Sequence, residues 1–124
     1  MKRRIIESWL MLLYFDWVMH LCGFHRLHAV VREYSVRRRA NGEDEAAKLC
    51  QAVDLACVFY FKRVMCLQRS AATTILLRRY GWKAELVIGA QLLPYESHAW
   101  VEVGDHVVND KPYMAEIFQV LERC

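Results

Sequence analysis

The first apolar positions of the chain predict a helix over residues 5–21. One set recurs with the 3.6-residue period of an α-helix, namely Ile6, Leu10, Leu13, Tyr14, Trp17, Val18 and Leu21. A second set makes the other side apolar too and comprises Ile5, Trp9, Leu12, Phe15 and Met19. A helix that is apolar nearly all round must be covered on both sides. We therefore expect a core helix with a second face that docks a partner protein; contact with a membrane surface is the less favoured alternative.

Basic residues before this helix give it the outline of a signal peptide or a membrane anchor. Lys2-Arg3-Arg4 precede the apolar run, but Glu7 and Asp16 interrupt it. The run is also shorter than the roughly 20 residues of a bilayer span, and no small-residue cleavage site follows it. These features favour a helix of a folded domain.

Two further helices are expected before the strand patterns begin. Residues 23–42 carry turn and charge signals and are expected to separate two helical regions. From Glu43 the helical pattern returns, with an apolar stripe that comprises Ala46, Leu49, Cys50, Val53, Ala56, Cys57, Tyr60 and Phe61. The next helix is expected from about Cys66 to Tyr80, with Gly81 at the left-handed position that ends many helices.

Strand patterns fill most of the remaining chain. Three runs are rich in β-branched and aromatic residues: Trp82–Ala90, Ser97–Val103 and His106–Asn109. The tail, Pro112–Cys124, is expected to be a short helix. Helices followed by an antiparallel meander predict an α+β fold, and 124 residues fit one domain.

Composition and charge narrow the class of partner. The apolar fraction of 56% supports a sizeable core with some apolar surface left over. The formal net charge is only +3, and the basic clusters lack the aromatic interleaving of a nucleic-acid surface, so we expect no nucleic acid. Arg37–Arg39 and Arg78-Arg79 are candidates to hold an acidic peptide or partner, and a solvated basic face is an equal alternative.

The cysteines indicate a reducing compartment. They form an odd set without a C-x-x-C pair, namely Cys22, Cys50, Cys57, Cys66 and Cys124. This usage disfavours a disulfide framework and favours a cytoplasmic location. His20, Cys22, His25 and His28 crowd together, but their spacing matches no dependable zinc pattern. We expect neither a metal nor a cofactor.

A thiol, an imidazole and a carboxylate follow one another in an order that suits nucleophilic catalysis. Cys66 opens a predicted helix, and His98 and Asp110 lie on predicted strands. A helix N-terminus and a neighbouring imidazolium both stabilise a thiolate, and a carboxylate orients the imidazole. Each residue alone is more often structural, so the prediction depends on their combination. Trp100 shares a strand face with His98 and is a candidate substrate-binding residue beside the site.

The sequence around these residues resembles one family. The motifs are Cys66-Leu67-Gln68-Arg69-Ser70, Leu76-Leu77-Arg78-Arg79-Tyr80-Gly81-Trp82, Leu86-Val87-Ile88-Gly89-Ala90, His98-Ala99-Trp100-Val101-Glu102-Val103 and Val107-Val108-Asn109-Asp110. They resemble the leader peptidases of lasso-peptide biosynthesis, which are transglutaminase-like cysteine proteases of the microcin-processing type. The resemblance is strong over residues 66–110 and covers 1–65 only in outline.

The resemblance implies a papain- or transglutaminase-like fold. N-terminal helices and a nucleophile-bearing helix would pack on a small antiparallel sheet. The whole chain, 1–124, would form a single protease domain, with a helical part over 1–65 and a catalytic core over 66–124.

The resemblance also implies roles and partners. Cys66 matches the nucleophile, His98 the general base and Asp110 the residue that orients the imidazole. Such an enzyme removes the leader from a ribosomally made precursor peptide, and a separate ATP-dependent lasso cyclase is a further candidate partner. The family uses a small, sheet-containing leader-recognition domain, which residues 1–65 do not resemble. We therefore expect a separate leader-recognition protein.

The register of the last hairpin decides whether the carboxylate can reach the imidazole. A two-residue loop would place Ala99 opposite Asp110 and turn that carboxylate to the face away from His98. A three-residue loop over 103–105 places His98 opposite Asp110. We expect the three-residue loop.

Two other functions stay open on the sequence. A catalytically silent module could keep the fold and hold a peptide, although the presence of all three residues argues against it. Acyl transfer uses the same triad as hydrolysis, because access of water to the acyl-enzyme decides between them. The backbone N–H of Cys66 is a natural oxyanion donor, and a second donor is not identified.

Overall fold

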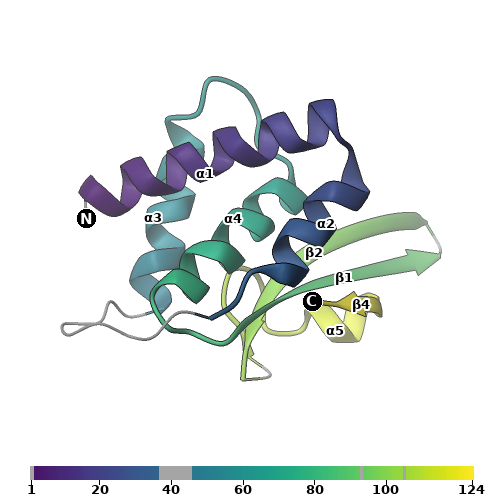
Figure 1. The fold of residues 1–124 in the computed structure, drawn as a ribbon. Helices are drawn as coiled ribbons and strands as arrows, with labels where there is room; N and C mark the ends of the chain where they lie inside the picture. Colours follow the sequence, from purple (N-terminus) through teal and green to yellow (C-terminus); the bar gives the residue numbers. More distant parts are fainter. Residues whose placement is uncertain (1, 37–45, 93, 105) are drawn as a thin grey trace.

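The computed structural model describes residues 2–36, 46–92, 94–104 and 106–124, and in this part it shows five helices and four strands (Figure 1). The helices are α1 (Lys2–Leu21), α2 (Phe24–Glu33), α3 (Ala46–Val58), α4 (Cys66–Arg79) and α5 (Met114–Ile117). The strands are β1 (Ala84–Leu92), β2 (Tyr95–Val103), β3 (His106–Val107) and β4 (Gln119–Arg123). They form one antiparallel sheet in the order β3-β2-β1-β4. The predicted α+β fold is confirmed.

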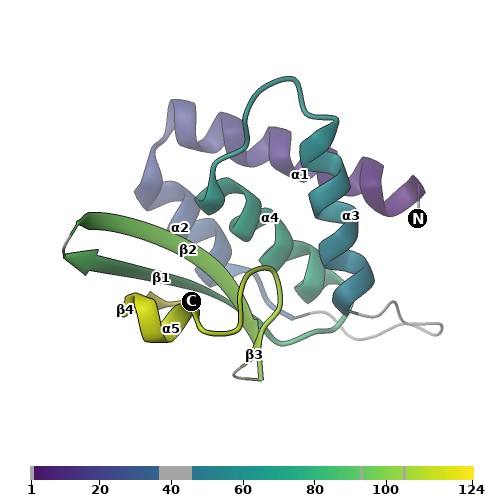
Figure 2. The same ribbon diagram turned by 180° about the vertical axis from the view of Figure 1, so that it is seen from behind.

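Helix α4 lies at the centre of the fold. It contacts α1 and α3 as well as β1 and β2, so it is enclosed between the other helices and the sheet (Figures 1 and 2). Its polar side chains are buried because they find partners. The Gln68 amide, for example, donates from Nε2 to the Leu12 carbonyl at 2.7 Å and joins α4 to α1.

Helix α1 packs with one of its two apolar faces and leaves the other exposed. Leu12 and Phe15 are fully buried in the main core. The opposite face keeps five large apolar side chains exposed, which we call the α1 apolar face: Ile6, Leu10, Tyr14, Trp17 and Leu21. No helix in the described part of the chain is long and apolar enough to cross a membrane. The expected second apolar face therefore exists, and among the described residues it lies uncovered.

The region between the first two predicted helices differs from the prediction. Residues 24–33 form α2, which buries Leu27 and Val31 in the main core. Gly23, with φ at +82°, separates α1 from α2 and marks a corner, as the turn signal at this residue predicted. The turn signal at Asn41-Gly42 lies outside the described residues. Arg37–Arg39 lie outside the described residues.

Helix α3 is shorter than predicted. It ends at Val58, so Phe61 lies beyond the helix and is mostly exposed rather than packed in the stripe. Tyr60 stays buried because its hydroxyl donates to Asp16 Oδ2 of α1 at 3.0 Å. The segment that leads into α4 is thus tied to α1 by a polar contact.

The end of α4 follows the prediction at Gly81. This residue has φ +90°, its N–H donates to Arg78, and the Trp82 N–H donates to Leu77, which is the Schellman arrangement. Arg78 is neither part of a solvated basic face nor placed to hold an acidic partner, the two alternatives for Arg78-Arg79. Its guanidinium is buried and donates to four backbone carbonyls, of Val31, Tyr34, Ala84 and Cys124.

The prediction of a helical tail is wrong in part. The single turn α5 is followed by β4, which pairs with the first strand rather than extending a meander. Leu86 of β1 and Cys124 exchange two backbone hydrogen bonds of 2.9 Å. The tail was mispredicted because a helix of four residues and a strand of five are too short for periodicity to distinguish.

Candidate active site

Cys66 is the first residue of α4, as predicted. The preceding residue, Met65, has an extended backbone, and no side chain caps the start of the helix. The first backbone N–H groups of a helix have no partner within it and carry partial positive charge. The Cys66 thiol is half-buried and free of any disulfide. The thiol therefore lies at the N-terminus of α4, next to the first N–H groups of the helix.

His98 and Asp110 are in direct contact. His98 Nε2 lies 2.7 Å from Asp110 Oδ2, and the two side chains are 24% and 21% exposed, so the pair borders solvent. An ionised carboxylate only accepts hydrogen bonds, so Nε2 carries the proton in this contact and Nδ1 stays available to another group. The structure brings together the imidazole and the carboxylate that the sequence singled out.

The Asp110 carboxyl is held in its ionised form. Burial alone would raise its pKa, but the hydrogen bond from His98 and the Lys111 N–H, which donates to Oδ1 at 2.8 Å, outweigh burial. The positive charges of His98 and Arg69 add to this effect. The pKa of Asp110 therefore lies below its ordinary value, which suits a residue that orients a protonated imidazole.

Aromatic rings support the imidazole from its other side. The rings of His98 and Phe118 are stacked, with centroids 5.4 Å apart and planes at 21°. Trp100 lies beside them, with its ring 6.4 Å from His98. Trp100 is fully buried, so it has no surface with which to contact a substrate. The structure therefore places the Trp100 ring in the packing beside His98 and not on a surface that could bind a substrate.

The Trp100 indole is fixed by a buried carboxylate. Trp100 Nε1 donates to Glu102 Oε2 at 2.8 Å, and Arg123 of β4 donates to the other carboxylate oxygen at 2.7 Å. Burial raises the pKa of Glu102, but these two hydrogen bonds and the Arg123 charge outweigh it and leave the pKa below its ordinary value. The wall of the site thus ends in an ion pair between the buried Glu102 and the exposed Arg123 side chain.

The three-residue hairpin loop expected between β2 and β3 is wrong. Val103 pairs with His106 and Glu102 with Val107, the register of a two-residue loop. Asp110 still reaches His98 because β3 ends at Val107, and the chain bends over 108–110 instead of continuing in the sheet. A bend, not a shifted register, brings the carboxylate to the imidazole.

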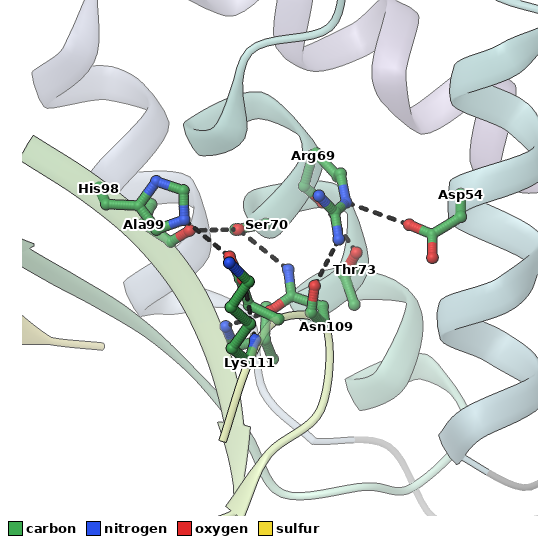
Figure 3. A network of polar contacts seen from close by, with 10 residues as sticks. Asp54, Arg69, Ser70, Thr73, His98, Ala99, Asn109 and Lys111 are labelled. Carbon is green, nitrogen blue, oxygen red and sulfur yellow. Dashed lines mark hydrogen bonds and ion pairs between the residues drawn. The ribbon is translucent and has the colours of Figure 1, made fainter. Parts of the chain in front are cut away.

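A buried polar network holds that bend against α4 (Figure 3). Asn109 Oδ1 accepts from the Val101 N–H at 2.8 Å, and its Nδ2 donates to Ser70 Oγ at 3.1 Å. Ser70 in turn donates to the Ala99 carbonyl, next to His98, at 3.0 Å. Residues four apart on a helix share a face, so Cys66 lies one turn before Ser70 on the side of α4 that contacts β2.

Sequence reasoning missed two residues of this region. Asn109 stood next to Asp110 in the motif, but nothing in its spacing indicated that its side chain would replace a backbone partner. Phe118 was missed because the tail was expected to be helical. Among the described residues, no group of three or more His, Cys, Asp or Glu side chains could hold a metal ion.

The region contains the side chains that general acid–base and nucleophilic chemistry use. A half-buried thiol at a helix start, an imidazole with one nitrogen available and an ionised carboxylate behind it are the groups that acyl transfer through a thioester requires. The same groups serve hydrolysis and transfer to an amine.

Comparisons with known proteins place the chain in a family. The Microcin J25-processing protein McjB of Escherichia coli is 30% identical over 99 residues, which cover 78% of this chain and 42% of that protein. The matched region thus spans less than half of its length. No solved structure matches the chain. Residues 9–123 match the Transglutaminase-like superfamily. The chain therefore belongs to the transglutaminase-like superfamily.

Proposed function

We propose that this chain is a cysteine peptidase that removes the leader from a ribosomally made lasso-peptide precursor. The observation that carries the proposal is the 2.7 Å contact between His98 and Asp110, on a strand that packs against the helix opened by Cys66. The similarity to a protein named for processing microcin J25 supports the substrate class.

In the proposed reaction the Cys66 thiolate attacks the carbonyl carbon of the scissile bond. The Cys66 N–H donates to the oxyanion, and protonated His98 gives its proton to the leaving amine as the C–N bond breaks. This step releases the core peptide and leaves the leader as a thioester on Cys66. Water then attacks the thioester with His98 as base, and the leader departs as a carboxylic acid.

A separate leader-recognition protein is the proposed partner. The described residues before α4 form the helices α1, α2 and α3 and contain no strand, so they supply no sheet that could bind a leader by strand addition. The α1 apolar face is the proposed docking surface. The freed amine of the core is a substrate for an ATP-dependent cyclase, which is a further proposed partner.

The test is mass spectrometry of a precursor peptide incubated with the protein and its leader-recognition partner. We expect cleavage at a single bond between leader and core, and no cleavage with Cys66→Ala. Equal cleavage by both proteins would remove Cys66 as the nucleophile. A bound but intact peptide would favour a silent binding module, and incorporation of an added amine in place of water would favour acyl transfer.

A further inference from the structure

Asn109 ends the pairing of β2 with β3 through its side chain. Val101 and Val108 form the next pair along the ladder, where regular antiparallel strands alternate between exchanging two backbone hydrogen bonds and none. The Val108 N–H donates to the Val101 carbonyl at 3.0 Å, but the Val101 N–H donates to Asn109 Oδ1 at 2.8 Å. An amide oxygen thus occupies the place of a backbone carbonyl, and the chain leaves the ladder.

Two residues of α4 hold Asn109 in this position, and one of them is itself bound to α3 (Figure 3). The Asn109 side chain is buried and donates to Ser70 Oγ of α4. The Arg69 guanidinium donates to the Asn109 carbonyl and forms an ion pair of 3.1 Å with Asp54 of α3. The residue before Asp110 is therefore anchored to β2, α4 and, through Arg69, α3.

This anchoring opposes a competing register. With the two-residue loop that the hairpin adopts, continued pairing would place Asp110 opposite Ala99 and on the face away from His98. If Asn109 did not accept from the Val101 N–H, the Val108 carbonyl could take its place and the ladder could continue. The side chain of Asn109 thus selects the bend in which Asp110 meets the imidazole.

We propose that Asn109 is a positioning residue that directs Asp110 onto His98 and acts on the reaction only through that carboxylate. The inference rests on the proposed function, since it takes Cys66, His98 and Asp110 as the reacting groups. It names a role for a residue that does not itself touch the imidazole or the thiol.

A double-mutant cycle tests the role without any peptide substrate. The four proteins are the wild type, Asn109→Ala, Asp110→Ala and the double variant. The readout is the rate of Cys66 alkylation by iodoacetamide from pH 5 to 9, measured on the Cys66 peptide by mass spectrometry. We expect each single change to slow labelling near neutral pH by about tenfold, and the double variant to match Asp110→Ala alone.

Two further variants keep the test decisive if Asn109→Ala folds poorly. Ser70→Ala removes the partner of the Asn109 amide but leaves the bond to Val101, so it should give a smaller loss that also vanishes in the Asp110→Ala background. Thr73→Ala is the matched control on α4, because its hydroxyl donates to the Arg69 carbonyl within the same helix. Circular dichroism on every variant reports the folded fraction.

The outcomes separate this inference from the proposed function. If Asn109→Ala slows labelling equally with and without Asp110, its role is general stability and the inference falls. If Asp110→Ala leaves the labelling profile unchanged, the triad and the inference fall together. If the cycle behaves as expected but no precursor is cleaved, the positioning role stands and the assigned substrate is wrong.

Discussion

The proposed reaction depends on the side chains of three residues. Cys66, His98 and Asp110 were singled out by type and order, and the contact between His98 and Asp110 is present. Asn109 was not recognised, because its effect depends on a hydrogen bond to a backbone group eight residues earlier. Trp100 was placed in the right region, but its complete burial could not be inferred from strand alternation alone.

The five thiols should differ sharply in reactivity. Burial, with a smaller effect of the neighbouring Asp54 charge, raises the pKa of Cys50 to about 11. At pH 8 only about one Cys50 thiol in a thousand is then a thiolate, which is the form that iodoacetamide attacks. We expect Cys66 to be alkylated while Cys50 stays unlabelled, as measured by peptide mass spectrometry.

Urea-unfolded protein is the control for this experiment, since all five cysteines should then react. Labelling of Cys50 in the folded protein at the rate seen after unfolding would contradict its assigned burial.

The buried carboxylate of Glu102 should make stability depend on pH. Its folded-state pKa lies below its ordinary value, so its contribution to the free energy of unfolding is present above about pH 4.3 and is lost as pH falls through the folded-state pKa. Glu102→Gln should therefore destabilise the protein by about 1–3 kcal/mol at pH 7, and the difference from wild type should shrink below pH 4. Urea unfolding followed by tryptophan fluorescence measures both values.

Glu116→Gln is the matched control, because Glu116 is exposed and a surface change should stay within about 0.5 kcal/mol. A destabilisation by Glu102→Gln that is the same at pH 7 and pH 3.5 would show that charge is not the cause.

At the scale of elements, the helices and strands with strong local patterns were predicted correctly. Elements that depend on tertiary contacts were not. The start of α4, its end at Gly81 and the first two strands follow from apolar patterning and turn chemistry. Helix α2, of ten residues, was missed because the charged residues and turn formers in the same region were taken as signs of a connecting segment. Strand β4 forms because β1 offers it an edge, which no local pattern reveals.

Strand β1 requires a glycine at one position behind the site. Gly89 pairs with His98, and a Cβ added there would lie 2.8 Å from the Trp100 ring and 3.0 Å from Phe118 Cβ and the Gln119 carbonyl oxygen. Gly89→Ala should therefore displace the rings that support the imidazole. We expect a loss of about 1–3 kcal/mol in the free energy of unfolding and slower alkylation of Cys66.

Gln91→Ala provides the comparison, since it changes a partly exposed residue two positions along the same strand. If the Gly89→Ala variant is as stable as this control and its Cys66 is alkylated at the same rate, the rings of Phe118 and Trp100 have room to move.

The whole molecule combines the enclosed helix α4 with an uncovered apolar face on α1. The sequence predicted both faces of the first helix as apolar, and the structure settles which one packs inward. Trp17 and Leu10 of the α1 apolar face are 62% and 55% exposed. Exposed apolar side chains gathered on one helix face favour binding to a partner.

Charge placed on this face should separate partner binding from reactivity. Leu10→Glu and Trp17→Glu are expected to weaken binding to the proposed leader-recognition protein by at least about tenfold, measured by calorimetry. Because neither side chain belongs to the core, alkylation of Cys66 should keep its wild-type rate.

Leu121→Glu on β4 is the matched control, with a side chain that is 64% exposed and far from α1 in sequence. Undiminished binding by both α1 variants would place the docking surface elsewhere.

The spacing of the His98–Asp110 contact has a consequence for the order of folding. The two residues are 12 positions apart and meet within a single hairpin and its bend, whereas Cys66 lies on α4, which comes near this hairpin only by packing on the sheet. Contacts that are close in sequence form sooner than those that close long loops. A partly folded chain would then hold an imidazole–carboxylate pair without the proposed nucleophile, so the proposed activity would arise only after α4 has docked on the sheet.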